Sequence, residues 1–227
     1  MRTALRILLV ASLLLAAPTL SHATGTNEAY NVILLMTDEH TPRVLGCYGD
    51  PLVKTPTLDA LAAKGVRFTS AYCQNPICVP SRVSLVSGRM PCHLNTYGNT
   101  ANQKYAAIDT LSDVFVKAGY NTAWFGKTHW GNPRFLENGS GSKNKQAAKD
   151  EQDEKIGRHP QQSQVSSWPL EKNAEHLTSE EARAFLDRNK GTNFFLGVSF
   201  VKPHFPFTIQ QKYYDMYKGK VTLPHAP

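Results

Sequence analysis

Two short, almost unbroken apolar runs constrain the fold of this chain more than any other sequence feature. Residues 31–37 read NVILLMT, and residues 193–201 read NFFLGVSFV. Apolar runs of this length, without alternating polar residues, are typical of strands buried on both faces of a parallel sheet. We therefore expect both runs to lie inside a sheet that is covered on its two faces.

Further strands and helices alternate along the chain between these runs. Strands are predicted at residues 66–72 and 120–125, and helices at residues 57–65, 80–88, 110–119 and 178–189. The expected helix starts are Thr57, Pro80, Thr110 with Asp113, and the capping box Thr178 with Glu181. This alternation predicts an α/β fold with a largely parallel sheet flanked by helices.

The first 23 residues have the three parts of a secretory signal peptide. Arg2 and Arg6 form a basic start, residues 7–17 are apolar, and residues 21–23 form a small-residue ending. The apolar part is shorter than the roughly 20 residues that a membrane span needs. We expect cleavage after Ala23 and an exported protein, periplasmic or extracellular, with no stable membrane anchor.

Residues 24–227 are expected to form a globular domain, and the composition of the whole 227-residue chain agrees with this. Hydrophobic residues make up 41% and charged residues 19%. The formal charge of +7 is spread along the chain, without the dense Lys/Arg block typical of a nucleic-acid arm, and it suits a small anionic substrate. Residues 138–167 are polar and lack periodicity, so we predict a surface loop there.

The chain has four cysteines, which are too few for a scaffold built on disulfides: Cys47, Cys73, Cys78 and Cys92. One bridge, between Cys73 and Cys92, stays open as an alternative in an exported protein. A zinc site is not expected, since the close Cys-x₂-Cys pairs typical of such sites are absent from the sequence.

Polar residues follow three of the predicted strands directly. Asp38 and Glu39 follow the first run, Lys127 and His129 follow the strand at 120–125, and His204 follows the last run. Open α/β sheets bind ligands at the carboxyl ends of their strands, so these side chains are expected to converge. Taken singly, each is more often an ordinary loop or capping residue.

The segment CVPSR, residues 78–82, opens the second predicted helix. A helix N-terminus and Arg82 would both favour a thiolate at Cys78. Thiolate phosphatase loops have a wider Cys-to-Arg spacing, however, whereas only three residues separate Cys78 from Arg82. The spacing therefore indicates a different chemistry at residue 78.

CVPSR, followed by a hydrophobic helix and Ser-Gly-Arg, resembles the signature of the sulfatase family, whose cysteine is oxidised to formylglycine. Other family-like blocks follow the family order: VILLMTDEH, GCYGDP, KTPTLDALAAKGVRF, GKTHWG and SFVKPHFPF. The first block is similar to choline-sulfatase-like and iduronate-sulfatase-like bacterial members. The resemblance implies the alkaline-phosphatase-like α/β core of a sulfuric ester hydrolase.

The resemblance also implies a nucleophile and a metal. A formylglycine hydrate at Cys78 would attack sulfur and release the alcohol, after which sulfate leaves and the aldehyde is restored. Asp38, Glu39 and the modified Cys78 would hold a divalent cation, usually Ca²⁺. The implied partners are a sulfated small molecule or glycan and a formylglycine-generating enzyme.

The remaining implied roles fall on four basic residues. Arg82 would steady the hydrate and the metal shell, while Lys127 and His129 would bind sulfate and orient the hydrate. His204 would lie near the leaving oxygen as a proton donor. Lys202, two residues earlier, is given no catalytic role.

Two departures from the family pattern stand out. Glu39 occupies a position where many sulfatases have a second Asp or a Gln, and no Asp-Asn pair follows His204. Sulfatases are considerably longer, and that pair completes their metal site. We therefore expect a C-terminally incomplete core, either a fragment of a longer product or a truncated enzyme. The alternatives are a phosphate or phosphonate ester hydrolase and a non-catalytic sulfate- or glycan-binding remnant.

Overall fold

The computed structural model describes residues 29–99, 108–130, 164–166 and 169–222. The predicted signal peptide at residues 1–23 lies outside these ranges and stays a prediction. Most of the predicted loop at 138–167 also lies outside them. Its last described part, residues 164–166, is a short strand rather than a loop. Within the described ranges, no helix has the length and apolar character needed to cross a membrane.

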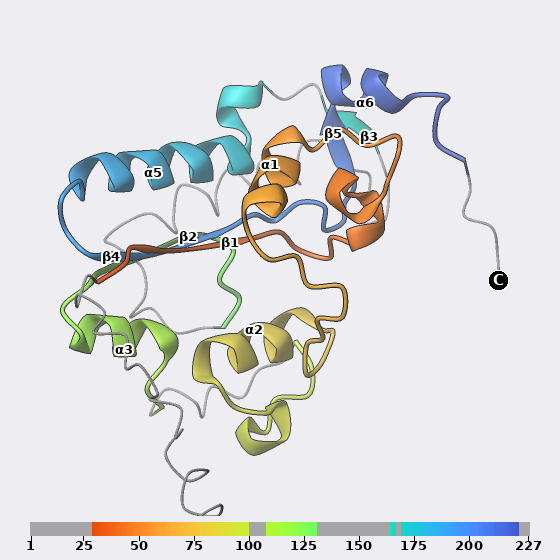
Figure 1. The fold of residues 1–227 in the computed structure, drawn as a ribbon. Coiled ribbons are helices and arrows are strands. Elements are labelled where there is room, and N and C mark those ends of the chain that lie inside the picture. The colour runs from red at the N-terminus through yellow and green to blue at the C-terminus, as the bar shows by residue number, and fades with distance from the viewer. Residues whose placement is uncertain (1–28, 100–107, 131–163, 167–168, 223–227) are drawn as a thin grey trace, which may run out of the picture.

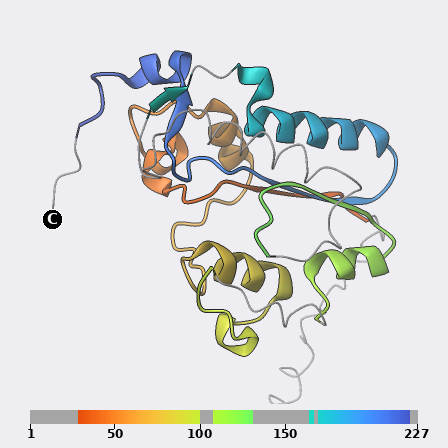
Figure 2. The same ribbon diagram turned by 180° about the vertical axis from the view of Figure 1, so that it is seen from behind.

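The described elements, in chain order, are β1 (Val32–Met36), α1 (Pro56–Lys64), α2 (Cys78–Ser87), α3 (Leu111–Lys117), β2 (Asn121–Gly126), β3 (Gln164–Ser166), α5 (Ala174–Arg188), β4 (Phe194–Ser199), β5 (Thr208–Gln210) and α6 (Gln211–Tyr217). Strands β1, β4 and β2 form a parallel sheet in that order, and β3 pairs with β5. Helix α5 covers one face of the three-stranded sheet, and α2 and α3 cover the other (Figure 1). The view from behind shows the same layers (Figure 2). The predicted α/β fold with a parallel sheet is confirmed.

The central strand β4 matches its prediction, because all six of its residues are buried. Its two faces contribute to two separate hydrophobic clusters. Phe195 packs with the α2 residues Val79 and Val83, while Leu196 packs with Phe185 of α5. The long apolar run is therefore explained by a strand that has helices on both sides.

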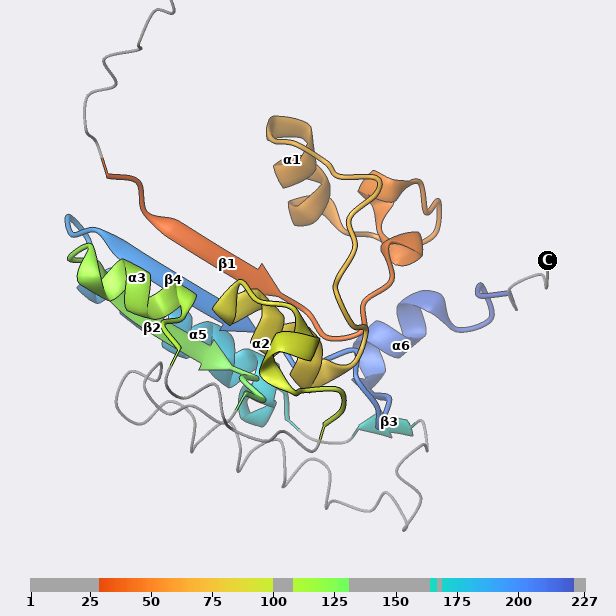
Figure 3. The same ribbon diagram turned by 90° about the horizontal axis from the view of Figure 1, so that it is seen from below.

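Strand β1 differs from its prediction. Its burial alternates, and Ile33 and Leu35 are 54% and 52% exposed. Among the described strands β1 lies at the edge of the sheet (Figure 3), and α5 packs on β2 and β4 instead. An apolar run alone does not tell a central strand from an edge strand, because that depends on which strands pair.

The helix starts were predicted less well than the helices themselves. The predicted helix start at Thr110 and Asp113 is confirmed at α3, where the structure shows that the two residues form a capping box. Helix α1 starts after Thr55 rather than at Thr57, and α2 starts at Cys78, two residues before Pro80. Pro80 remains in the first turn, where the helix needs no amide hydrogen from it.

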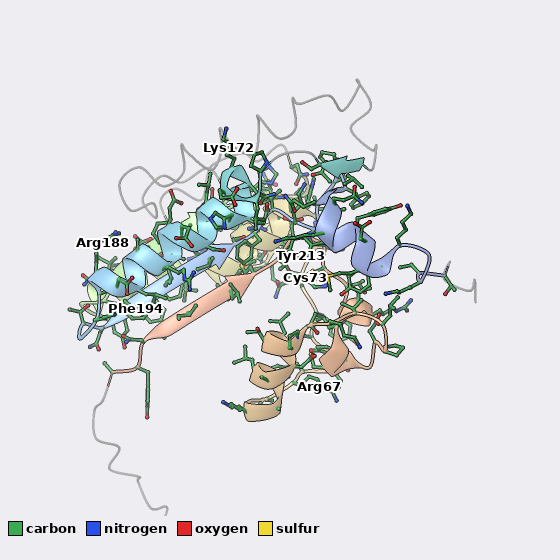
Figure 4. The ribbon with its side chains drawn as sticks, turned by 90° about the horizontal axis from the view of Figure 1, so that it is seen from above. Arg67, Cys73, Lys172, Arg188, Phe194 and Tyr213 are labelled. Carbon is green, nitrogen blue, oxygen red and sulfur yellow. The ribbon has the colours of Figure 1, made fainter. Side chains whose placement is uncertain are left out.

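The predicted start of the fourth helix at Thr178 is wrong. Helix α5 begins after Asn173, whose side chain accepts a hydrogen bond from the Glu175 amide at 2.8 Å. Thr178 lies inside the helix, where its hydroxyl donates to the Ala174 carbonyl. Figure 4 shows the length of α5, with Arg188 at its end near Phe194 and Lys172 before its start. Several residues in this stretch can cap a helix, and packing on the sheet decides among them.

The predicted strand at residues 66–72 is also wrong. The segment is extended or bent without strand pairing, and Val66, Phe68 and Tyr72 are 80%, 68% and 89% exposed. An alternating pattern supplies the faces of a strand but not its hydrogen-bonding neighbour. In α3, Leu111 and Phe115 pack inward as predicted, whereas Val114 is exposed.

Gly126, at the end of β2, allows the chain to turn into the site. Its φ is +83°, and a Cβ there would lie 2.1 Å from the Ser199 carbonyl oxygen. The same oxygen accepts the Lys127 amide hydrogen at 2.7 Å. A side chain at residue 126 would therefore displace the backbone that carries Lys127.

We expect Gly126→Ala to lower the free energy of unfolding by about 3 kcal/mol, from the left-handed φ and the steric contact together. Gly191→Ala is the matched control, because Gly191 has a φ of +84° and no atom within 4 Å of a built Cβ. That control is expected to lose about 1 kcal/mol. Urea denaturation measures both variants, and equal losses would contradict the contact with Ser199.

Candidate functional site

The predicted site residues converge at the carboxyl ends of the parallel strands. Asp38 and Glu39 follow β1, Lys127 and His129 follow β2, and His204 follows β4. The fourth contributor is the N-terminal end of α2, where Cys78 is the first helical residue. Strand topology thus brings together groups that are far apart in the sequence.

Asp38 is the centre of this arrangement and is only 4% exposed. Its Oδ2 lies 2.9 Å from Nη2 of Arg82 and 2.7 Å from Nζ of Lys127. Its Oδ1 lies 3.8 Å from Sγ of Cys78, and the Lys127 ammonium lies 3.7 Å from the same sulfur. One carboxylate and one ammonium group therefore lie next to the cysteine sulfur, and Arg82 binds the same carboxylate.

Arg82 links three elements while it holds Asp38. Its Nη1 donates to the Lys127 carbonyl at 2.8 Å and to the Ser199 hydroxyl at 2.9 Å. Arg82 is 4% exposed and Ser199 is fully buried. Ser199 was missed in the sequence, where it reads as an ordinary residue of the β4 run. Its only signal was its place at the end of a buried strand.

Glu39 and His129 both have left-handed backbones, with φ of 50° and 57°. This region is uncommon for residues other than glycine, and such strained residues cluster at functional sites. Both residues directly follow strand ends at the site. The strained backbone is therefore a second indication, which the sequence does not contain, that the carboxyl ends of these strands form a functional site.

Four ligand-type side chains form a compact cluster at the same place. One ligand atom each from Asp38, Glu39, Cys78 and His204 lie within 4.8 Å of one another. The Nε2 atom of His204 lies 3.6 Å from Oε1 of Glu39. The structure therefore brings the three residues predicted as metal ligands together, with His204 beside them.

A cavity of about 240 Å³ adjoins the cluster. Lys127, His129 and His204 line it, together with Lys202 and Glu175. The ammonium of Lys202 donates to the Pro206 carbonyl at 3.2 Å and to the Thr208 hydroxyl at 2.5 Å. The basic side chains make this cavity suited to a small anionic group.

Charge and burial shift two pKa values in the site. Burial disfavours the charged form of Asp38, but Lys127 and Arg82 together outweigh it and hold the pKa of that carboxyl below 3.8. Partial burial and the charges of Lys127 and Arg82 lower the pKa of His129 below 6.5. At neutral pH the site therefore has an ionised Asp38 and a neutral imidazole at His129.

The shifted pKa of Asp38 predicts an acid-dependent stability. A carboxyl whose pKa is lower in the folded state stabilises the fold above its unfolded pKa, and loses that contribution as pH falls through the folded value. We expect wild type and Asp38→Asn to differ in free energy of unfolding by a constant amount between pH 7 and about pH 5. The difference shrinks below pH 3.8, the ordinary Asp value. Denaturation in metal-free buffer measures it, and a gap that widens in acid would contradict the pKa direction.

The cysteines form no disulfide among the described residues. Cys73 and Cys92 are exposed and free, so the alternative of a bridge between them is not realised in the structure. Cys47 and Cys78 are half-buried and also free. Of the four, only Cys78 lies in the acidic and basic cluster.

The chain belongs to the sulfatase family, whose model matches residues 30–225. It is 28% identical to iduronate 2-sulfatase of Mus musculus, over 97% of this chain and 44% of that protein. It is 35% identical to the ulvan-active sulfatase of Formosa agariphila, over 82% of this chain and 38% of that protein. The chain thus spans less than half the length of these relatives.

Solved structures show the same fold. A structure determined in complex with its substrate D-glucosamine-2-N,6-O-disulfate superimposes with a TM-score of 0.66 at 25% identity, covering 88% of this chain and 40% of that one. A phosphonate monoester hydrolase of Agrobacterium radiobacter superimposes with a TM-score of 0.65 at 22% identity, over 83% and 44%. The parallel sheet and its helices are therefore the alkaline-phosphatase-like sulfatase core.

Proposed function

We propose that this chain is the part of a sulfate ester hydrolase that contains the catalytic nucleophile, a formylglycine made from Cys78. The observation that supports this best is the meeting of Asp38, Lys127 and Cys78 at the start of α2. Family membership supports the same reaction class. Because the chain covers less than half of its relatives, the activity of the whole protein is part of the proposal.

A sulfate ester presents negative oxygens that shield the sulfur from a nucleophile. Lys127 and the N-terminus of α2 supply positive charge where these oxygens would lie. Arg82 already donates hydrogen bonds to Asp38, Ser199 and the Lys127 carbonyl. In this proposal its role is to keep Asp38 and Lys127 in place. The cavity lined by Lys127, His129 and His204 is the binding place for the sulfate in this proposal.

Once formed, formylglycine supplies a hydrated aldehyde that is a stronger nucleophile toward sulfur than a side-chain alcohol. His129, neutral at pH 7, is suited to orient that group and to accept its proton. His204 lines the same cavity and is the proposed proton donor to the departing alcohol oxygen. In this proposal His129 accepts a proton and His204 donates one, so the two histidines have opposite roles.

The clustered donors fit a divalent cation. Asp38 and Glu39 offer carboxylate oxygens, the ligands that Ca²⁺ prefers, and their ligand atoms lie within 4.8 Å of those of Cys78 and His204. A bound cation would polarise the sulfate and neutralise charge. In this proposal Asp38 and Glu39 hold it, together with the modified residue 78. Two carboxylates are fewer than the usual ligand set for Ca²⁺, so weak binding is expected from these residues alone.

The proposed substrate is a sulfated small molecule or glycan. This class is supported by the similar solved structure, which was determined with the substrate D-glucosamine-2-N,6-O-disulfate, and by the related ulvan-active sulfatase. The proposal includes a formylglycine-generating enzyme as the partner that modifies Cys78. It also includes export to the periplasm or the outside of the cell, which depends on the predicted signal peptide.

Mass spectrometry tests the nucleophile directly. Trypsin releases residues 68–82 as one peptide that contains both Cys73 and Cys78. We expect fragment ions to place an aldehyde at residue 78 and a thiol at residue 73, in protein isolated from the native host. An unmodified thiol at residue 78 in that protein would exclude the formylglycine mechanism.

Turnover separates the three functional alternatives. The expected result is release of the phenol from an aryl sulfate in the presence of Ca²⁺, with a slower reaction on the matching aryl phosphonate. Faster reaction of the phosphonate would favour the phosphonate hydrolase. Binding of inorganic sulfate without any turnover, by protein shown to be modified at residue 78, would favour the non-catalytic remnant.

A further inference from the structure

The segment that leaves β4, residues 200–204, determines where two site residues lie. The Phe200 amide donates to the Met36 carbonyl at 3.0 Å, which continues the pairing with β1. The Lys202 carbonyl then accepts the Asp38 amide hydrogen at 3.4 Å, and the His204 amide donates to the Val201 carbonyl at 3.0 Å. A shift of this segment would therefore move the backbones of both Asp38 and His204.

Glu175, in the first turn of α5, holds this segment from the other side. Its Oε1 accepts the Val201 amide hydrogen at 3.1 Å and the Lys202 amide hydrogen at 3.0 Å. Both amides lie beyond Ser199, the last residue of β4, so the strand ladder does not supply their acceptor. Hydrogen bonds to an ionised carboxylate are about twice as strong as those between neutral groups.

The two hydrogen bonds that Glu175 accepts from the Val201 and Lys202 amides form a clamp. The part of α5 that carries this clamp is well packed. Asn173 is 5% exposed and caps α5 by accepting the Glu175 amide hydrogen at 2.8 Å. Farther along α5, Ala182 and Phe185 are buried in the cluster formed with β2 and β4. The carboxylate is therefore carried by a helix that is packed on the same sheet whose strand ends bear the site.

The second oxygen of Glu175 argues for more than a stabilising role. Oε2 is buried and has no hydrogen-bond partner among the described residues, and Glu175 lines the cavity that Lys127, His129 and His204 also line. A buried acceptor without a partner costs free energy, so the carboxylate is not placed for stability alone. Its position is explained if it serves the geometry of the adjoining site.

We propose that Glu175 is a positioning residue that sets the place of His204 and Asp38 through the Val201 and Lys202 amides. The proposal rests on the proposed function for the reaction that it serves, but the clamp itself is a property of the folded chain. A misplacement of about 1 Å in a catalytic group can cost about a hundredfold in rate. The loss of Glu175 is therefore expected to reach the site through the backbone of residues 201–204, as a lower kcat.

Amide hydrogen exchange, followed by NMR, tests the clamp without any need for turnover. In Glu175→Ala we expect the Val201 and Lys202 amides to exchange about tenfold to a hundredfold faster than in wild type, since each loses its acceptor. Glu175→Gln is expected to stay within about threefold of wild type, because its amide oxygen can accept both hydrogens. Glu180→Ala is the control, because Glu180 is an exposed glutamate on the same helix, and it should leave both amides unchanged.

Glu175→Asp keeps the charge but shortens the reach, so it is expected to behave like the alanine variant. The Gln and Asp variants decide the question by themselves if Glu175→Ala does not fold. Wild-type exchange in Glu175→Asp, or fast exchange in Glu175→Gln, would overturn the clamp.

A double-mutant cycle tests the link to the site. Glu175→Ala is expected to lower kcat on an aryl sulfate about a hundredfold with little change in KM, and to add little further loss in the His204→Ala background. Fully additive losses would overturn the action through His204. If wild type shows no turnover, the proposed function fails, whereas the exchange measurements still decide the clamp.

Discussion

Replacing Cys78 with alanine is expected to reduce aryl sulfate turnover by at least about a thousandfold, because the substitution removes the nucleophile. Binding of inorganic sulfate is expected to remain, since Lys127 and the N-terminus of α2 stay in place. Steady-state kinetics and sulfate titration on the same preparations measure the two effects. We expect turnover to be lost without loss of sulfate binding, because the nucleophile lies at residue 78 whereas Lys127 and the N-terminus of α2 bind the sulfate.

Cys73→Ala is the matched control for this prediction. Cys73 is five positions before Cys78 but is exposed, free and outside the cluster. We expect wild-type turnover from this variant, and also a tryptic peptide that still carries the aldehyde at residue 78. Residual turnover of Cys78→Ala at the wild-type level would contradict any covalent role for residue 78.

Replacing Asp38 with asparagine is expected to lower the free energy of unfolding by roughly 3 kcal/mol, because it strips two buried cations of their shared partner. Arg82 is 4% exposed and the Lys127 side chain is 12% exposed, so water cannot replace the lost carboxylate well. Urea denaturation at pH 7 in metal-free buffer measures the change. The same variant is expected to lose turnover, which makes Asp38 important to both fold and function.

Asp109→Asn is the control for the loss of stability. Asp109 pairs with Lys117, but both side chains are more than 60% exposed. Exposed ion pairs contribute little, so this control is expected to unfold at nearly the wild-type urea concentration. A loss at Asp109 as large as that at Asp38 would show that burial is not the cause.

Local sequence patterns identified most of the elements but not their edges. The run around Phe195 predicted a doubly covered strand correctly, whereas the similar run around Leu35 proved to be an edge strand. The helix start at Thr110 was predicted correctly, whereas the capping box predicted at Thr178 was wrong, because Thr178 lies inside α5. Such patterns show what a segment can do, and the neighbours that it meets in space decide between the options.

Most residues of the candidate site could also be predicted from the sequence. The structure places all the site residues predicted from the strand ends and the CVPSR spacing at the carboxyl ends of the parallel strands. They are Asp38, Glu39, Cys78, Arg82, Lys127, His129 and His204. Ser199 and Glu175 were not found, because each sits in a segment that reads as an ordinary strand or helix. Their importance comes from contacts, not from any motif.

The amino-acid sequence by itself determined the α/β class, the family and the residue types of the site, because buried runs, capping residues and motif spacing are local properties of the chain. Only the tertiary structure decided that Arg82 reaches Ser199, 117 positions away, and Asp38, 44 positions away. It likewise decided that Glu175 holds amides 26 and 27 positions further on. These contacts depend on the order of strands in the sheet, and strand order is set by packing between distant segments.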